Sequence, residues 1–282
     1  MSLKKIIENT PSPRTVSSLT DDLKQLGVKR GDMVIVHSAL STLGWVCGGA
    51  QAVIEALIKT VGEEGTLIMP AQSPDWSDPE EWCEPEIPQE WWSIIKKEMP
   101  AFDPAVTPTQ EMGAVAEYFR TYPGVIRSSH PLESFCAWGK HKEFVTKEQP
   151  LDFAMGENSP LEKIYSQDGK VLLIGVGYNS NTSMHLSEHR VPFIPIVQDG
   201  CAMVINGERV WKTYKSIEYG DELFDEIGEH FEKEYPALVT QGKVGSAFSR
   251  LMLQRDIVDY AESWFKNNKD KLPFIRDSND ER

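Results

Sequence analysis

Three residues near the middle of the chain have types and a spacing that could carry chemistry. His185, Glu188 and His189 form an H-x-x-E-H pattern inside the stretch VLLIGVGYNSNTSMHLSEHRVPF, residues 171–193. On a helix, residues three or four positions apart share a face. The pattern is compatible with a metal site, in which both histidines are ligands and the glutamate is a base. It is equally compatible with a single general base, His185, whose neighbour Glu188 fixes its tautomer or meets a cationic substrate.

The length of the helix favours the second interpretation. A helix can begin only near Asn181 or Thr182, and Pro192 disfavours helix at the residue before it, which leaves about two turns. Zinc sites of this pattern lie on longer and better buried helices. We therefore expect no metal and assign His189 a structural role, while zinc stays the alternative that chelation and elemental analysis would reveal.

A second set of polar residues follows the apolar, β-branched run at residues 33–36. His37 and Ser38 come directly after it. Neighbours on an extended strand point to opposite faces, so His37 does not activate Ser38 as a nucleophile, and the chain has no G-x-S-x-G elbow. The loop that follows, with Gly44 within it, instead indicates backbone N–H groups that bind an anionic or carbonyl-bearing ligand.

Ser128, Ser129 and His130 form a second hydroxyl-rich corner of the same kind, with His130 restricted by the proline that follows it. Cys47 and Cys136 are isolated cysteines, which are more often small buried apolar residues than nucleophiles.

The elements that must position these residues read as an α/β fold. A strand, a glycine-containing loop and a helix in series predict a central, mostly buried sheet flanked by helices, with a ligand site at the carboxyl ends of its strands. Asn206-Gly207 is the strongest hairpin signal in the chain. Strands are predicted at residues 33–36, 65–70 and 171–174. Helices are predicted at residues 17–26, 113–119, 222–234 and 246–266.

The chain divides into three parts of unequal size. We predict a polar N-terminal arm over residues 1–16, a single domain over 17–268, and a charged tail over 269–282 that frays. Within the domain, residues 71–109 are rich in proline, tryptophan and acidic side chains. A long irregular insertion is either a functional lid or disordered, and its tryptophans favour an ordered lid.

Composition limits the partners. The 282 residues carry a net charge of -14, which argues against nucleic acid and anionic membrane surfaces because both need a basic footprint. The four cysteines form no CxxC pair, and the chain shows neither a signal peptide nor an apolar run of membrane-spanning length. We therefore expect a cytoplasmic protein with reduced thiols, whose acidity suits a polycationic ligand.

The residues also resemble a known family. The segments that carry the resemblance include HSALSTLGWVCGG, GTLIMPAQSPDWSDPEEW, LDFAMGENSPLEKIY and VLLIGVGYNSNTSMHLSEHR. From about residue 15 to residue 265 the chain is similar, in the same order, to aminoglycoside 3-N-acetyltransferases. This resemblance implies an α/β fold distinct from the more common acetyltransferase fold, with acetyl-coenzyme A as co-substrate and an amine of an aminoglycoside as acceptor, so that the enzyme confers resistance.

The resemblance also implies roles for particular residues. It places His185 and Glu188 at the reacting centre. Two positions depart from the family pattern: Cys136 stands where relatives commonly have alanine, and Gln149 stands where many have histidine, which would weaken activity if that histidine binds the acceptor. The residues placed along the coenzyme A arm are His37, Ser38, Ala39, Leu40, Ser41, Gly44, Ser128, Ser129, His130, Pro131, Ser134 and Phe135.

The implied chemistry fits these residue types. A histidine can take the proton that an attacking amine must lose, and Thr182 with nearby loop amides can stabilise the negative charge that develops on the carbonyl oxygen. We predict direct transfer in a ternary complex, without a covalent intermediate, and the sequence is compatible with a homodimer. Carboxylates expected to line the cleft of the cationic acceptor are Asp75, Asp152, Glu157 and Asp221.

Two alternatives to this activity remain at the level of sequence. The protein could acetylate an amine other than an aminoglycoside. It could also bind a polycation without modifying it, in which case it has no reason to bind an anionic nucleotide thioester.

Overall fold

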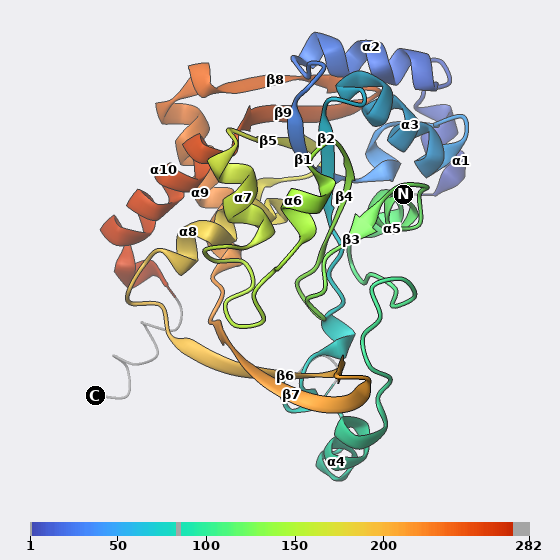
Figure 1. The fold of residues 1–282 in the computed structure, drawn as a ribbon. Helices are drawn as coiled ribbons and strands as arrows, with labels where there is room; N and C mark the ends of the chain where they lie inside the picture. Colours follow the sequence, from blue (N-terminus) through green and yellow to red (C-terminus); the bar gives the residue numbers. More distant parts are fainter. Residues whose placement is uncertain (1, 83–85, 273–282) are drawn as a thin grey trace.

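A seven-stranded mixed sheet forms the centre of the protein, in a computed structural model that describes residues 2–82 and 86–272. The strand order is β3-β4-β2-β1-β5-β9-β8, and β1 pairs in parallel with both β2 and β5 while the outer pairs are antiparallel (Figure 1). The strands are β1 Met33–Ser38, β2 Thr66–Pro70, β3 Ile126–Arg127, β4 Phe135–Gly139, β5 Lys170–Ile174, β8 Val239–Val244 and β9 Ala247–Leu253.

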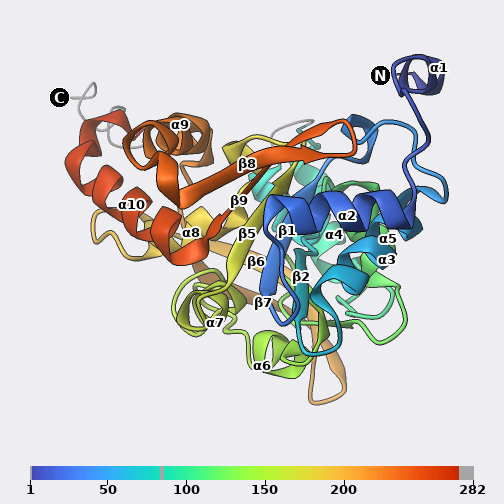
Figure 2. The same cartoon turned by 90° about the horizontal axis from the view of Figure 1, so that it is seen from above.

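Helices cover both faces of the sheet because its central strands are apolar on both sides. In β1, Val34 and Val36 face one core and Ile35 faces the other. Figure 2 shows the two helical layers on either side of the sheet. Beside Val34 and Val36 lie α2 Val16–Leu26, α3 Gly49–Val61 and α5 Gly113–Arg120. The other layer contains α6 Lys142–Thr146, α7 Pro160–Ser166, α8 His185–His189, α9 Phe224–Glu234 and α10 Gln254–Asn267.

The parallel pairing of β1 with β5 brings the two candidate stretches together. Ser38 at the end of β1 is level with Ile174 at the end of β5, so the segments that follow the two strands leave the same edge of the sheet. Gly175 makes the turn out of β5 with a φ of +67°, and a Cβ there would lie 1.9 Å from Thr42 Oγ1. A side chain is therefore excluded at this turn both by backbone conformation and by space.

A long two-stranded hairpin stands apart from the main sheet. It consists of β6 Ile196–Ile205 and β7 Glu208–Ile217, joined by Asn206 and Gly207, which both have the positive φ that a tight hairpin turn needs. The hairpin signal in the sequence is thereby confirmed.

The predicted lid segment, residues 71–109, packs against this hairpin. The Phe102 N–H donates to the Ala202 carbonyl (2.8 Å), and the Asp78 N–H donates to Asp199 Oδ1 (2.9 Å). The segment also forms α4 Gln89–Glu98, which lies at the outer end of the hairpin (Figure 1). Residues 83–85 of the segment lie outside the described residues, and its role as a lid stays a prediction.

Two predicted elements differ from those observed. The helix predicted at residues 246–266 is instead strand β9 followed by α10, because Ala247, Ser249 and Leu251 alternate inward along a strand that pairs with both β5 and β8. The arm expected at residues 1–16 contains the short helix α1 Leu3–Glu8.

The fraying of the charged tail at residues 269–282 stays a prediction. Of the tail expected to fray, residues 273–282 lie outside the described residues. Among the residues that the structure describes, no helix combines the length and apolarity needed to cross a membrane.

Candidate active site

The His185–Glu188 pair sits where the sequence predicted a short helix. A 3₁₀ turn over Thr182–Met184, capped by the Asn181 side chain, leads into α8, which ends before Pro192. Because the two residues are three positions apart, their side chains meet, and His185 Nδ1 lies 2.6 Å from Glu188 Oε2.

Glu188 is fully buried, and both of its oxygens have donors. Its second oxygen, Oε1, accepts a hydrogen bond from the Gly220 N–H (2.6 Å). Both oxygens of this carboxylate act as acceptors, so the hydrogen bond to His185 is donated by Nδ1–H. The other ring nitrogen of His185, Nε2, is then the basic one.

The surroundings of His185 raise its basicity. Its ring packs against Tyr219 and Phe224, with centroid distances of 4.6 and 4.9 Å. Burial by itself lowers the pKa of His185, but the charge and hydrogen bond of Glu188, with further contributions from Asp221 and Glu133, outweigh it and raise that pKa above the ordinary value. His185 is therefore a stronger base than a free histidine.

His189 has a different environment. Its Nε2 lies 3.3 Å from the Tyr219 hydroxyl, and burial, together with the charge of His185, lowers its pKa to about 4, so it is neutral. The two histidines thus have separate partners. Across residues 2–82 and 86–272, the structure brings together no group of three or more His, Cys, Asp or Glu side chains that could hold a metal ion.

Two cavities meet at His185. The smaller, of about 480 Å³, opens at the ends of β1 and β2, and the larger, of about 840 Å³, extends toward the hairpin. Both are bordered by the same five residues, so His185 can reach the contents of each. These shared residues are Gln72, Glu111, Met112, His185 and Asp221.

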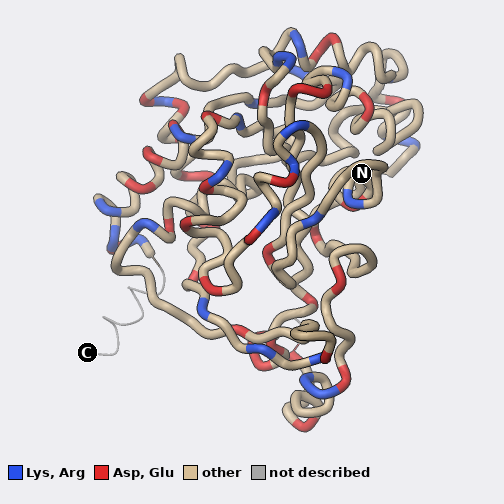
Figure 3. Tube along the Cα trace, in the orientation of Figure 1, with Lys and Arg blue, Asp and Glu red and all other residues tan. Residues whose placement is uncertain are grey.

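The larger cavity is strongly acidic. Six carboxylates line it, and its described lining contains neither lysine nor arginine. Figure 3 shows acidic residues along the hairpin and the segment that faces it. Such a cavity attracts cations and repels anions. The six are Glu81, Glu111, Glu133, Asp199, Glu218 and Asp221.

The smaller cavity has mostly uncharged walls. His37 lines it, with an Nε2 atom that is buried and lacks a hydrogen-bond partner within the described part of the chain. Burial, with a smaller contribution from His185, lowers the pKa of His37 to about 3, so this side chain is neutral. An enclosed polar atom without a partner is costly unless a ligand or water satisfies it.

Six of the residues singled out from the sequence line one or both of these cavities, and Glu188 contacts one of them, His185. Of the loop expected to follow the coenzyme A arm, the first residues line the smaller cavity, whereas Leu40, Ser41 and Gly44 lie further along the loop and outside both described linings. These six predicted residues are His37, Ser38, Ala39, Thr182, His185 and Asp221.

The second expected coenzyme A corner, residues 128–135, is mostly internal. Ser128 Oγ donates to Gln149 Oε1 (2.6 Å), and His130 Nδ1 accepts from the Glu133 N–H (2.9 Å). Burial lowers the pKa of His130 to about 4, despite its hydrogen bond to the Leu151 carbonyl. These hydrogen bonds fix the conformation of the corner.

Four other residues of this corner lie outside the described linings of both cavities. Ser129 is exposed, while Pro131, Ser134 and Phe135 are buried. Of the described residues of the corner, Leu132 and Glu133 reach the larger cavity. A coenzyme A contact from this corner stays a prediction.

The two departures from the family pattern have structural roles. Gln149 is buried, and its Nε2 donates to the carbonyls of Glu133 (2.7 Å) and Ala154 (2.9 Å), so it supports the corner from behind. Cys136 is buried in the sheet, and burial raises its pKa to about 12, which makes the thiol a packing group.

Three of the four carboxylates expected in the acceptor cleft lie outside the described lining of the larger cavity. Asp75 is exposed on the insertion, Asp152 accepts from the Lys215 N–H (2.9 Å), and Glu157 pairs with Arg190 (2.8 Å). Of the six carboxylates in the larger cavity, sequence reasoning assigned only Asp221 to the acceptor and missed Glu81, Glu111, Glu133, Asp199 and Glu218. Asp199 has no local signal, whereas Glu133 stands beside the recognised His-Pro corner.

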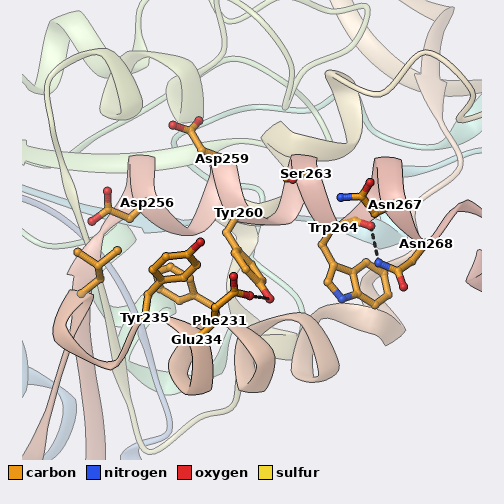
Figure 4. A pocket seen from close by; sticks show the side chains of 11 residues that line it. Phe231, Glu234, Tyr235, Asp256, Asp259, Tyr260, Ser263, Trp264, Asn267 and Asn268 are labelled. Carbon is orange, nitrogen blue, oxygen red and sulfur yellow. Dashed lines mark hydrogen bonds between the residues drawn. The ribbon is translucent and has the colours of Figure 1, made fainter.

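A third cavity, of about 510 Å³, lies on the surface between α9 and α10 (Figure 4). Phe231, Tyr235 and Tyr260 form its aromatic wall, and Tyr260 donates to Glu234 (3.2 Å). This cavity does not include His185 in its described lining.

Comparison with known proteins shows similarity along most of the chain. The family model of aminoglycoside 3-N-acetyltransferase matches residues 35–266. YokD of Bacillus subtilis, a prophage-derived aminoglycoside N(3')-acetyltransferase-like protein, is 52% identical, over 95% of this chain and 98% of its own. The crystal structure of YokD has a TM-score of 0.93 to this one and covers 95% of this chain and 99% of its own.

Less similar proteins point to the same family. Aminoglycoside N(3)-acetyltransferase VII of Streptomyces paromomycinus is 33% identical, over 93% of this chain and 94% of its own. AAC-IIIb, in a structure described as binary with CoASH, has a TM-score of 0.82 at 29% identity, covering 91% of this chain and 97% of its own. The chain therefore belongs to the aminoglycoside 3-N-acetyltransferase family, which confirms both the resemblance found in the sequence and the α/β fold that it implied.

Proposed function

We propose that this protein transfers an acetyl group from acetyl-coenzyme A to the 3-amino group of an aminoglycoside, by direct attack within a ternary complex, and so confers resistance. The observation that carries the proposal is the meeting of two cavities at the His185–Glu188 pair. Membership of the acetyltransferase family supports the same activity.

The smaller cavity suits the donor. Coenzyme A carries negative phosphates, which the acidic larger cavity would repel, so the donor's neutral pantetheine arm fits beside His37 and Ser38 at the end of β1. The unpartnered Nε2 of His37 offers that arm a polar contact. The relative AAC-IIIb, whose structure is described as binary with CoASH, supports coenzyme A as the carrier.

The larger cavity suits the acceptor. Its six carboxylates attract a molecule with several positive charges and place it beside His185. The net charge of -14 supports the same class of partner and gives no basis for nucleic acid or an anionic membrane. A homodimer stays a prediction, which light scattering tests.

The His185–Glu188 pair can perform the proton transfers. As the nitrogen–carbon bond forms, His185 Nε2 takes the proton that the amine loses, and the ionised Glu188 stabilises the imidazolium through Nδ1–H. The thioester's carbon–sulfur bond then breaks, and His185 can return the proton to the departing sulfur. Thr182, in the wall of the smaller cavity, is the side-chain donor proposed for the carbonyl oxygen.

A panel of amines with acetyl-coenzyme A tests this activity through the release of free thiol. We expect turnover with aminoglycosides, and at least about tenfold higher kcat/KM for them than for simple monoamines, because each additional ammonium group can meet a carboxylate. Mass spectrometry should find one added acetyl group, and a chelator should leave the rate unchanged.

Each other outcome identifies an alternative. Thiol release with simple amines but not with aminoglycosides indicates a different acceptor. Binding of polycations without binding of acetyl-coenzyme A indicates a non-catalytic binder. Loss of activity on chelation, with about one metal per chain by elemental analysis, indicates the zinc alternative.

A further inference from the structure

Glu133 is an unusual member of the acidic cavity because only half of its carboxylate has a partner. Its Oε1 accepts a hydrogen bond from the Tyr219 hydroxyl (2.9 Å), whereas Oε2 is buried and meets no donor among the residues that the structure describes. The side chain nevertheless belongs to the lining of the larger cavity, beside His185.

The backbone of Glu133 is held in place from both sides. Its N–H donates to His130 Nδ1 (2.9 Å), and its carbonyl accepts from Gln149 Nε2 (2.7 Å). The corner built by Ser128, His130 and Gln149 therefore fixes the position from which this carboxylate reaches the cavity. This gives the corner a role in presenting Glu133.

Asp199, another carboxylate of the cavity, has partners on both of its oxygens. Asp199 Oδ1 accepts from the N–H groups of Asp78 (2.9 Å) and Gly200 (2.6 Å), and its Oδ2 accepts from the Tyr214 hydroxyl (3.2 Å). Asp199 therefore links the hairpin to the predicted lid segment through its hydrogen bonds. Glu133 differs in having an oxygen to which a ligand can still donate.

We propose that Glu133 determines acceptor specificity by receiving an ammonium group of the acceptor on its unpartnered oxygen. The proposal rests on the function proposed above and assigns it a particular contact. The terminal torsion of a glutamate is soft, so the carboxylate can turn toward a donor in the cavity. An ammonium group would supply the missing hydrogen bond and the missing positive charge together.

The groups that face Glu133 determine its charge in the empty cavity. They are Tyr219, which follows β7, His185 on α8, and Asp199 on β6. Burial is the largest effect, and with Asp199 it raises the pKa of Glu133 to about 7, against the opposing effects of the Tyr219 hydrogen bond and of His185. At neutral pH a large share of the molecules therefore hold a proton on Glu133.

Binding of the acceptor should expel that proton. An adjacent ammonium group favours the ionised carboxylate and lowers the pKa of Glu133. With a pKa of about 7 in the empty cavity, about half a proton per site should be released from Glu133 on binding at pH 7. The net release includes every group that titrates on binding, so the difference between the wild type and a Glu133 variant isolates this contact.

The experiment compares the wild type with Glu133→Gln and, as a matched control, Glu143→Gln. Glu143 is an exposed glutamate in the first turn of α6 and lies outside both described linings. The acceptor is the aminoglycoside with the highest turnover in the panel described above. Calorimetry in two buffers of different ionisation enthalpy gives the protons released, and thiol release gives kcat and KM.

We expect Glu133→Gln to raise the acceptor KM by roughly 10- to 100-fold, to remove about half a proton from the release at pH 7, and to leave acetyl-coenzyme A affinity unchanged. Unchanged coenzyme affinity also shows that the variant is folded. Glu143→Gln should match the wild type in all three measurements.

The outcomes separate this inference from the function on which it rests. A wild type that releases no thiol with any aminoglycoside overturns the proposed function and this inference with it. A wild type that turns over, with a Glu133→Gln variant whose acceptor KM and proton release are both unchanged, overturns the specificity role alone.

Discussion

Replacing His185 by alanine is expected to lower kcat for acetyl transfer by roughly 10²- to 10⁴-fold, because the attacking amine then loses its proton to no positioned base. The affinity for acetyl-coenzyme A should stay close to that of the wild type, since the smaller cavity keeps His37, Ser38 and Ala39. Thiol release at saturating concentrations of both substrates measures the first effect, and calorimetry with acetyl-coenzyme A measures the second.

The control for this variant is His141→Ala. His141 precedes α6 and lies outside the described linings of both cavities, so its loss should not change kcat. Turnover by His185→Ala within a fewfold of the wild type would remove His185 from the role of base. Loss of acetyl-coenzyme A binding would instead indicate that the alanine variant has lost the structure of the site.

Replacing Glu188 by glutamine is expected to lower kcat/KM by about 10²-fold or more and to shift its pH dependence. Glutamine keeps the size of the side chain but removes the charge that stabilises the imidazolium, and its single acceptor oxygen cannot serve both the Nδ1–H of His185 and the Gly220 N–H. Alanine is less suitable because it would leave a void at a fully buried position and the Gly220 N–H unpaired.

The direction of the pH shift follows from the pKa of His185. A general base works when neutral, so the wild-type rate falls as the pH drops through the raised pKa of His185, which lies above its ordinary value. In Glu188→Gln the burial that lowers this pKa is no longer outweighed by Glu188, so the acid limb should move to lower pH. A profile of kcat/KM against pH measures the shift, and an acid limb that stays in place would contradict the assigned pairing.

Much of the fold follows from local pattern. The apolar runs before His37 and at residues 171–174 predicted β1 and β5, and Asn206-Gly207 predicted the hairpin. The contact between His185 and Glu188 could be predicted from the sequence because residues three positions apart on a helix share a face. Pro192 likewise limited the predicted length of that helix.

Other parts of the site arise from contacts that no local pattern encodes. Asp199 reaches the larger cavity only because its hairpin folds back beside the insertion, to which Asp78 connects it across 121 positions of sequence. The one hydrogen-bond donor to the Glu133 carboxylate that the structure describes is the hydroxyl of Tyr219, which is 86 positions away in the sequence. Helix and strand are also ambiguous in short apolar runs, which is why the segment that forms β9 was predicted as helix.

Initial rates with both substrates varied test the central claim most directly, namely that donor and acceptor occupy two cavities at once and meet at His185. Direct transfer in a ternary complex predicts that double-reciprocal plots at several fixed acceptor concentrations intersect. Parallel lines, with release of free thiol from acetyl-coenzyme A in the absence of any acceptor, would show a covalent acetyl-enzyme and contradict the account.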